Sequence, residues 1–599
     1  MIKIKHKGLK IILLIALILV IILTTILIIV NNNINSIVSA KIKEDFKNSE
    51  YSKYYELNFN NLRVNTITGT IRFSNVEFIP KEDADTIFFY NNGKYNIKIK
   101  TYILKGADIY KYIETDTVNV ELIKIIEPEI EITEYKKKIK NDMKEVFFIS
   151  PFVEVKKISV KKGKFTKIDN YSSSNKTVEN VNILIKQFQF ISNEKQRNLH
   201  FGEADIKLKN IRLTKNDGKG IKVENFNIKF KNLNTKKDSI LIRYTFDNFI
   251  VEANNLETST DDYNILVKNI NADFKKKDIE LTDFKLTPHL SKQKFTKKYK
   301  YQKELFDINI NMLKIENIEI DSLIYNQTIL AKNIIIKKGN IKIYNDQTKP
   351  LDLNKFPLLP NQTIIKIPNR INIKKIETQD INILIESKTK DGRNGFVDLN
   401  INTEIKNINN IDLTKPLLIS VNGYIHNIVP FNVNLRFNYN IEGFAYNGKI
   451  KSFDLTKLND IVSSYYPVVI KSGNVKSINF KGLAKNGVSK GNMEFRYNKL
   501  KLKFLTEEDK SDIQYYKNNL LSFTANTIIL SNNPSSNTTP LRDIDFIFER
   551  DKNKGIGNYL FKSFFTGITE TIMPNKENRK KYSDKRKNAK HNNLSVVKP

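Results

Sequence analysis

The residue types that carry most enzyme chemistry are few and scattered in this chain of 599 residues. There is no cysteine, which excludes disulfides, thiolate-bound zinc, iron–sulfur clusters and a thiol nucleophile. The histidines are His6, His200, His289, His426 and His591. None of them has the short spacing that brings two imidazoles to one metal ion. We therefore expect no metal site and no cofactor.

Neighbouring carboxylates are the other groups that could do chemistry, and Asp261-Asp262 and Glu507-Glu508 are examples. A general acid and base need a shielded site with a defined separation. Both pairs stand in polar, turn-like sequence, so we interpret them as solvated surface. The chain also contains no phosphate-binding loop, nucleophile elbow or dinucleotide-binding fingerprint. The sequence predicts no catalytic residue and a protein that is not an enzyme.

The chain is strongly basic, with 99 Lys and Arg against 65 Asp and Glu and a formal charge of +34. Such a surplus is typical of proteins that bind nucleic acid or an anionic membrane surface. Most of the lysines are scattered through alternating segments, which favours solvated strand faces, and we expect no nucleic-acid partner. The exception is the tail 575–599, where basic residues concentrate without apolar periodicity. We interpret this tail as disordered and suited to anionic phosphates.

The N-terminal region predicts a membrane anchor. Residues 11–30 carry no charge and are long enough, at ~1.5 Å per residue, for a ~30 Å hydrocarbon core. A cleaved signal peptide is the alternative, because Val38-Ser39-Ala40 could serve as its cleavage site. The apolar run is longer than a removable one usually is, so we favour an uncleaved anchor. The four lysines of segment 1–10 place that segment in the cytoplasm and the bulk of the chain across the membrane.

Most of the remaining chain is predicted to form β-strands. A helical connector over 31–56 leads into residues 57–550, where apolar and polar residues alternate with period two. Helical patterns are short and few. We therefore predict a mainly β fold in which a transmembrane helix precedes a long, twisted, largely antiparallel sheet.

The alternation repeatedly slips by one residue, as in NNLRVNTITGTIRFSNVEFIP at 60–80. A slip turns later side chains to the other face unless a bulge restores them, and Asn adopts the left-handed backbone of a bulge readily. We predict bulges or bends where apolar-x-Asn-apolar-x-apolar recurs. These positions are Asn61, Asn75, Asn180, Asn210, Asn225, Asn248, Asn269, Asn317 and Asn333.

A sheet with one apolar face must bury that face against something. The predicted helices are too few to cover it. Either the sheet closes on itself, as sandwiches or a barrel, or it curls into an open groove for a long apolar ligand. Periodicity alone does not separate these alternatives.

Residues 453–505 resemble the C-terminal region of AsmA-like proteins of Bacteroidetes-type bacteria. The matching residues are Asp454, Leu458, Asn459, Pro467, Ser472, Gly473, Val475, Ile478, Phe480, Gly491, Phe495, Tyr497 and Leu500. The region after the predicted anchor is similar to the same family at Tyr54, Tyr55, Leu57, Phe59, Gly69, Asn75, Val76 and Pro80. These are diffuse apolar patterns and not catalytic motifs. The strongly basic tail departs from the family.

The resemblance implies an open β-groove, with an AsmA-like C-terminal module at about 365–550, anchored in the inner membrane of a Gram-negative bacterium and reaching into the periplasm. It implies membrane phospholipids as partners, envelope proteins as further candidates, and a role in guiding lipid between membranes or in outer-membrane assembly and homeostasis. The alternative is an anchored structural or adhesion protein of stacked β-sandwiches without lipid cargo. The expected groove lining is Phe73, Val76, Phe78, Val181, Ile183, Ile185, Ile228 and Phe230.

An amphipathic helix is predicted over 551–574, before the basic tail. Its apolar residues recur every four positions, and Pro574 follows its end. The helix either lies on a bilayer or plugs the end of the β-region. The stripe consists of Ile556, Leu560, Phe564, Ile568 and Ile572.

Overall fold

The computed structural model describes residues 34–65, 68–107, 117–135, 152–192, 197–215, 219–237, 242–466, 468–504, 529–574, 577–581 and 583–584. The predicted cytoplasmic segment 1–10 and anchor 11–30 lie outside these residues, as does most of the tail 575–599. Within the described ranges, no helix is long and apolar enough to cross a membrane.

The fold is mainly β, as predicted. All 23 described strands belong to one hydrogen-bonded sheet. The chain forms two compact units: unit 1 is Met1–Ser259 with Asn269–Lys275, and unit 2 is Thr260–Lys268 with Lys276–Pro599. Strand β11 (Tyr263–Asp273) contributes residues to both units. The described strands do not divide into the separate sheets from which the stacked sandwiches of the alternative hypothesis would be built.

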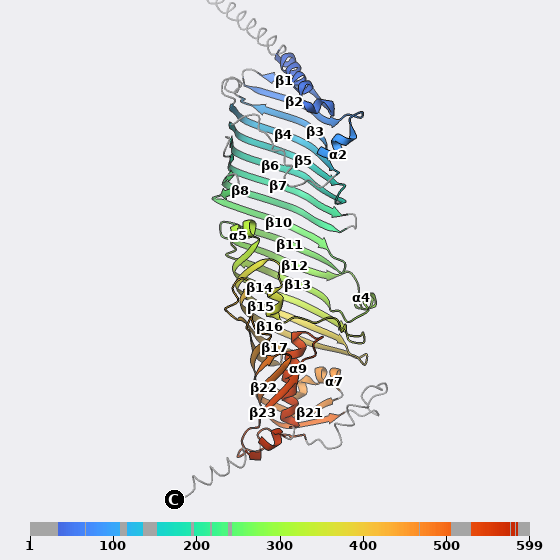
Figure 1. Ribbon diagram of the computed structural model, residues 1–599, viewed down its shortest axis with the longest axis vertical. Coiled ribbons are helices and arrows are strands. Elements are labelled where there is room, and N and C mark those ends of the chain that lie inside the picture. The colour runs from blue at the N-terminus through green and yellow to red at the C-terminus, as the bar shows by residue number, and fades with distance from the viewer. Residues whose placement is uncertain are drawn as a thin grey trace, which may run out of the picture. The chain divides into compact units, whose positions relative to one another are not determined.

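In unit 1, strands β1 to β9 each pair with the next strand along the chain, and β10 pairs with β8 (Figure 1). A helix at 34–48, within the predicted connector, precedes the first strand. The 3₁₀ turn Glu50–Lys53 and helix α2 (Thr86–Asn92) are the other short helical elements. The strands are β1 (Tyr55–Asn65), β2 (Thr70–Pro80), β3 (Lys94–Lys105), β4 (Thr117–Glu134), β5 (Phe152–Asp169), β6 (Ser174–Ser192), β7 (Arg197–Lys215), β8 (Gly220–Lys237), β9 (Ile242–Thr245) and β10 (Asn248–Ser259).

In unit 2, consecutive strands pair from β12 to β19, β21 pairs with both β19 and β20, and β22 and β23 follow in order. Its helices are α4 (Lys292–Lys298), α5 (Ile320–Asn326), α6 (Pro360–Ile365), the 3₁₀ turn Leu455–Leu458, α7 (Asn459–Tyr465) and α9 (Ile556–Ile572). Its strands are β12 (Asp278–Pro288), β13 (Leu305–Glu316), β14 (Thr328–Asp346), β15 (Arg370–Lys388), β16 (Asn394–Asn409), β17 (Leu417–Ile425), β18 (Val429–Phe437), β19 (Gly443–Ile450), β20 (Phe453–Asp454), β21 (Val468–Lys485), β22 (Val488–Phe504) and β23 (Asp543–Glu549).

The prediction of a largely antiparallel sheet is confirmed, with two exceptions. Strands β4 and β5 are parallel, and so are β14 and β15. A parallel step cannot be closed by a tight hairpin and needs a crossover connection. The second crossover, residues 347–369, is described completely and carries α6.

Five of the nine predicted Asn positions have the left-handed backbone of a bulge: Asn61, Asn75, Asn180, Asn210 and Asn317, with φ between 49° and 52°. The strand register shifts beside the first four of them. The left-handed backbone is not found at Asn225, Asn248, Asn269 and Asn333, which do not adopt positive φ. Elsewhere Glu127, Lys162 and Gln187 take up the same conformation with φ of 50° to 55°. The bulge is therefore a property of the strand position, and Asn is only one residue that fills it.

We expect Asn75→Val to lower the free energy of unfolding by about 1–2 kcal/mol, because a β-branched residue is strained at φ 50°. Asn75→Gly should change it little, since Gly has no Cβ to strain. Asn225→Val is the matched control, because Asn225 stands in the same sequence pattern without positive φ. Thermal unfolding followed by circular dichroism measures all three. An Asn75→Val loss no larger than that of Asn225→Val would contradict the bulge assignment.

Candidate functional site

The candidate site is the apolar face of the unit 1 sheet. Directly paired residues on neighbouring strands point to the same face. One continuous row of such partners crosses eight strands from β2 to β10: Phe73, Tyr102, Ile125, Val160, Ile183, Ile206, Ile228 and Val251. A second row runs beside it through Ile71, Leu104, Ile123, Ile158, Ile185, Ala204, Phe230 and Phe249.

The structure brings the eight predicted lining residues to this face. Five of them belong to the two rows. Val181 lies two residues before Ile183 on β6 and therefore shares its face. Val76 and Phe78 follow the bulge at Asn75, which adds one residue and returns them to the face of Phe73.

Aromatic rings extend the apolar face across several strands. Ring centroids lie 5.3 Å apart for Phe188 and Phe201, 5.7 Å for Phe201 and Phe230, and 6.0 Å for Phe230 and Phe249. Phe274, just after β11, lies 4.7 Å from Phe249. Such pairs stabilise by about 0.5–1.5 kcal/mol beyond the area they bury. The sequence analysis missed this ladder, because its signal lies in strand register and not in spacing along the chain.

The apolar face is only partly buried. Phe230 is buried, but the other seven predicted lining residues keep intermediate exposure. Among the described elements of unit 1, β3 to β8 pack chiefly against neighbouring strands and not under a second layer. Beside β1 and β2, helix 34–48 does contact the face. There the Phe46 ring lies 6.2 Å from Phe78, and Val64 N donates a hydrogen bond to Asn35 Oδ1 (2.5 Å).

The opposite face is charged. Lys100 and Glu127 lie 2.7 Å apart, and Lys186 lies 2.8 Å from Glu203, with side chains from a third to well over half exposed. Hydrogen bonds from these lysines lower the pKa of Glu127 and of Glu203. Exposed pairs of this kind contribute little to stability. The lysines of the strands therefore form a solvated outer surface, as the sequence pattern favoured.

No protein-family model and no curated protein matches this chain. The likeness to AsmA-like proteins therefore stays a hypothesis carried by the residues quoted above. Several of those residues have a clear packing role: Val475, Ile478, Phe480, Phe495 and Tyr497 are all at most 6 % exposed. Their alternation marks the hydrophobic core of unit 2 and carries no functional information by itself.

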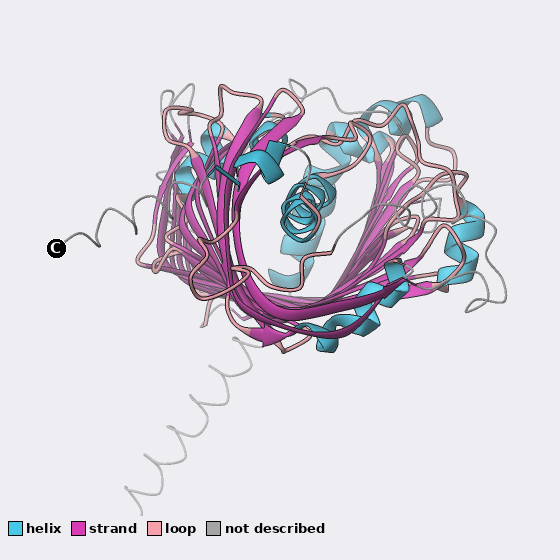
Figure 2. Cartoon of the chain, turned by 90° about the horizontal axis from the view of Figure 1, so that it is seen from below, coloured by secondary structure: helices cyan, strands magenta, loops and turns pink. Residues whose placement is uncertain are grey.

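Helix α9 packs against this core, on the concave side of strands that include β21 to β23 (Figures 1 and 2). Phe564 lies 5.0 Å from Phe480, and Tyr559 lies 5.6 Å from Phe444. The most buried positions of the helix are Tyr559, Ser563, Gly567, Thr571 and Ile572. The contact is close, because a Cβ added at Gly567 would come within 2.7 Å of Met493 Cε.

The predicted stripe of α9 lies at the edge of this contact. Ile556, Leu560, Phe564 and Ile568 are partly buried against the core, and Ile572 is buried. This packing favours the plug over the bilayer-lying alternative, because the apolar residues already have a protein partner.

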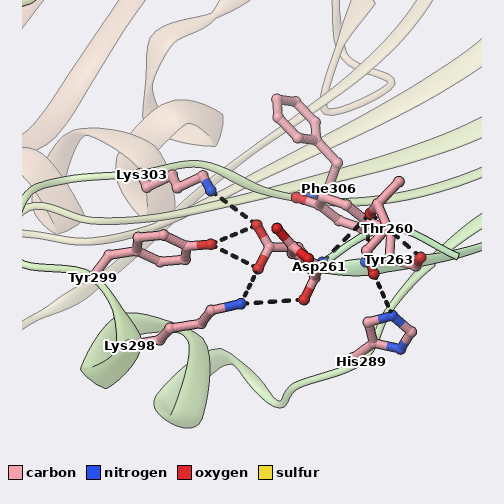
Figure 3. A network of polar contacts seen from close by, with 9 residues as sticks. Thr260, Asp261, Tyr263, His289, Lys298, Tyr299, Lys303 and Phe306 are labelled. Atoms are coloured by element: carbon pink, nitrogen blue, oxygen red, sulfur yellow. Dashed lines mark hydrogen bonds and ion pairs between the residues drawn. The ribbon is translucent and has the colours of Figure 1, made fainter. Parts of the chain in front are cut away.

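A cluster of polar side chains surrounds Asp262 in unit 2 (Figure 3). Its carboxylate accepts hydrogen bonds from Lys298 Nζ (2.6 Å), Lys303 Nζ (2.9 Å) and the Tyr299 hydroxyl (2.6 Å). Asp262 is only 8 % exposed, so its interpretation as solvated surface is wrong. The contact could not be predicted from local sequence, because the lysines that cover Asp262 follow more than thirty residues later.

This cluster fixes a loop and is unsuited to proton transfer. Burial by itself would raise the pKa of Asp262, but hydrogen bonds from Lys298, Tyr299 and Lys303 outweigh it and hold the pKa well below its usual range. A carboxylate this weakly basic is a poor general base. The bonds instead dock α4 and the chain after it on the turn at Thr260. Nowhere in the described ranges do three or more His, Asp or Glu side chains group to hold a metal ion.

Asp262→Asn should lower the free energy of unfolding by about 2 kcal/mol, the scale of hydrogen bonds to a charged group. The folded pKa lies below the unfolded value of about 3.9, so the contribution is complete above that pH and is lost as the pH falls below it. The difference in Tm between wild type and variant should therefore shrink below about pH 4. The exposed neighbour Asp261, changed to Asn, is the control. Equal Tm losses for the two variants at neutral pH would remove the special role of Asp262.

Proposed function

We propose that the protein is a membrane-anchored periplasmic protein that binds acyl chains on its apolar sheet face and guides phospholipid between membranes, or supports outer-membrane assembly and homeostasis. The observation that carries this proposal is the pair of apolar rows across eight strands. They are continuous, only partly buried, and backed by a charged face. An apolar surface of this extent on a soluble protein usually marks an interaction site.

The dimensions fit a lipid chain. Eight strands spaced ~4.8 Å apart make a row roughly 34 Å long. The hydrocarbon core of a bilayer, which holds two layers of acyl chains, is about 30 Å thick. One extended acyl chain therefore fits along either row with room to move between strands. A bound chain would lie against isoleucine, valine and phenylalanine side chains and leave the charged face in water.

The direct test is the lipid content of the full chain purified in mild detergent. Native mass spectrometry and lipid extraction should find phospholipid beyond the detergent-exchanged background. A folded sample that is reproducibly free of lipid would favour the structural alternative.

Ile183→Asp and Ile228→Asp probe the middle of the first row. On an open face the new carboxylate stays hydrated, so Tm should fall by only a few degrees while copurified lipid is lost. In a sealed core the same change would bury an unpaired charge and unfold the region. Lys157→Asp is the control, because Lys157 is exposed. Its partners on the neighbouring strands are Leu122 and Lys186, and neither is acidic. Unchanged lipid in both Ile variants would exclude this face as the binding surface.

A further inference from the structure

We infer that the crossover between β14 and β15 docks on an anionic lipid bilayer through an exposed apolar tip. This crossover, residues 347–369, is here called the strap. The inference rests on the proposed function only for its purpose, since a protein that guides lipid must meet a membrane. The docking itself is argued from the residues of unit 2 alone.

The tip of the strap, residues 352–356, is an ordered turn. Asp352 Oδ1 accepts a hydrogen bond from Asn354 N (3.1 Å), and Asp352 O accepts one from Lys355 N (3.2 Å). The chain before α9 holds the tip from the other side. Asn553 Nδ2 donates to Leu353 O (2.9 Å) and Lys355 O (3.0 Å).

Arg550 completes this attachment. Its Nη2 donates to Pro357 O (2.7 Å) and to Lys554 O (3.1 Å), and its guanidinium carbon lies 5.7 Å from the Tyr559 ring centroid. Further along, Leu359 is buried in the core at 2 % exposure. The strap is therefore tied to the sheet and to the start of α9, and its tip has a defined conformation.

This fixed turn presents two large apolar side chains to solvent. Leu353 is 69 % exposed and Phe356 is 62 % exposed. One exposed leucine is ordinary, but a leucine and a phenylalanine within four residues of an ordered turn form a patch that needs a partner. Leu358, Ile365 and Ile367 on the same strap are also exposed.

The charge around the tip selects the kind of partner. The strap contains three Lys and one Asp, and residues 550–555 contain Arg550, Lys552 and Lys554 against Asp551, so each segment carries a net +2. Lys355 and Lys552 are exposed. Apolar side chains surrounded by basic ones match a bilayer with anionic headgroups, where the apolar groups enter the interface and the lysines stay at the phosphates. The predicted apolar stripe of α9 packs against the core, and Phe561, its exposed apolar residue, is 51 % exposed, less than Leu353 and Phe356. The neighbouring strap tip therefore offers the more accessible apolar contact.

The chain contains no tryptophan, so Phe356→Trp gives a single fluorescent reporter at the tip. The full chain is reconstituted with nanodiscs of phosphatidylcholine and mixed with vesicles. Vesicles that contain phosphatidylglycerol should shift the emission to the blue, pure phosphatidylcholine vesicles should not, and salt should reverse the shift. Tyr171→Trp is the control, because Tyr171 is similarly exposed (61 %) on the turn between β5 and β6. No shift at position 356, or the same shift at position 171, overturns the inference.

The variant Leu353→Ser/Phe356→Ser separates docking from lipid binding in the groove. Its partition to phosphatidylglycerol vesicles should fall by about tenfold or more, with Tm and copurified phospholipid unchanged. Lys355→Glu/Lys552→Glu should weaken partition at low salt and have less effect at high salt. Unchanged partition in the double Ser variant overturns the inference, whatever the lipid content. A wild type without copurified lipid that still docks through the tip contradicts the proposed function and not this inference.

Discussion

The structure depends on keeping one face of a single sheet apolar along strands of up to 19 residues. Side chains alternate strictly along a strand, so one extra residue turns every later side chain to the other face. Long strands also twist, and the twist misaligns neighbouring rows unless the register is adjusted. The left-handed residues make that adjustment. Without the bulge at Asn180, for example, Val178 and Val181 would point to opposite faces.

The two faces of the unit 1 sheet differ in composition and in role. Lysine and glutamate on the outer face keep it hydrated and contribute little to folding. Isoleucine and phenylalanine on the other face supply cross-strand packing while remaining only partly buried. Unit 2 resolves the same problem differently, because α9 and Leu359 of the strap cover its apolar face and complete a core. One sequence pattern thus produces a covered face in unit 2 and an uncovered face in much of unit 1.

The sequence was sufficient for local structure and for the side of the sheet on which a residue lies. Alternation between the slips identified the strands, and Ile183 and Ile228 fell on the predicted face because the period of two is unbroken beside them. The four-residue spacing identified α9, although its deepest face, at Ser563 and Gly567, uses small residues that a hydrophobic pattern does not reveal. Contacts between segments far apart in the chain could not be predicted from the sequence. Asp262 resembled a solvated residue because Lys298 and Lys303 approach it only after the chain has passed through two further strands, β11 and β12.

The strand order of unit 1 also determines how the protein could change in length. Strands that pack chiefly on their two neighbours make stability close to a sum of nearest-neighbour terms, as in repeat proteins. Adding or removing one hairpin among the antiparallel strands β5 to β8 would leave the direction of the flanking strands unchanged. The sheet would grow or shrink by two strands, about 10 Å, without rebuilding either end. Adding a single strand would reverse the direction of every strand after it. A parallel pair such as β4 and β5 can compensate for this reversal, so one strand can be added or removed there. Insertions should therefore be tolerated in units of a hairpin, and evolution can adjust the length of the sheet separately from its ends.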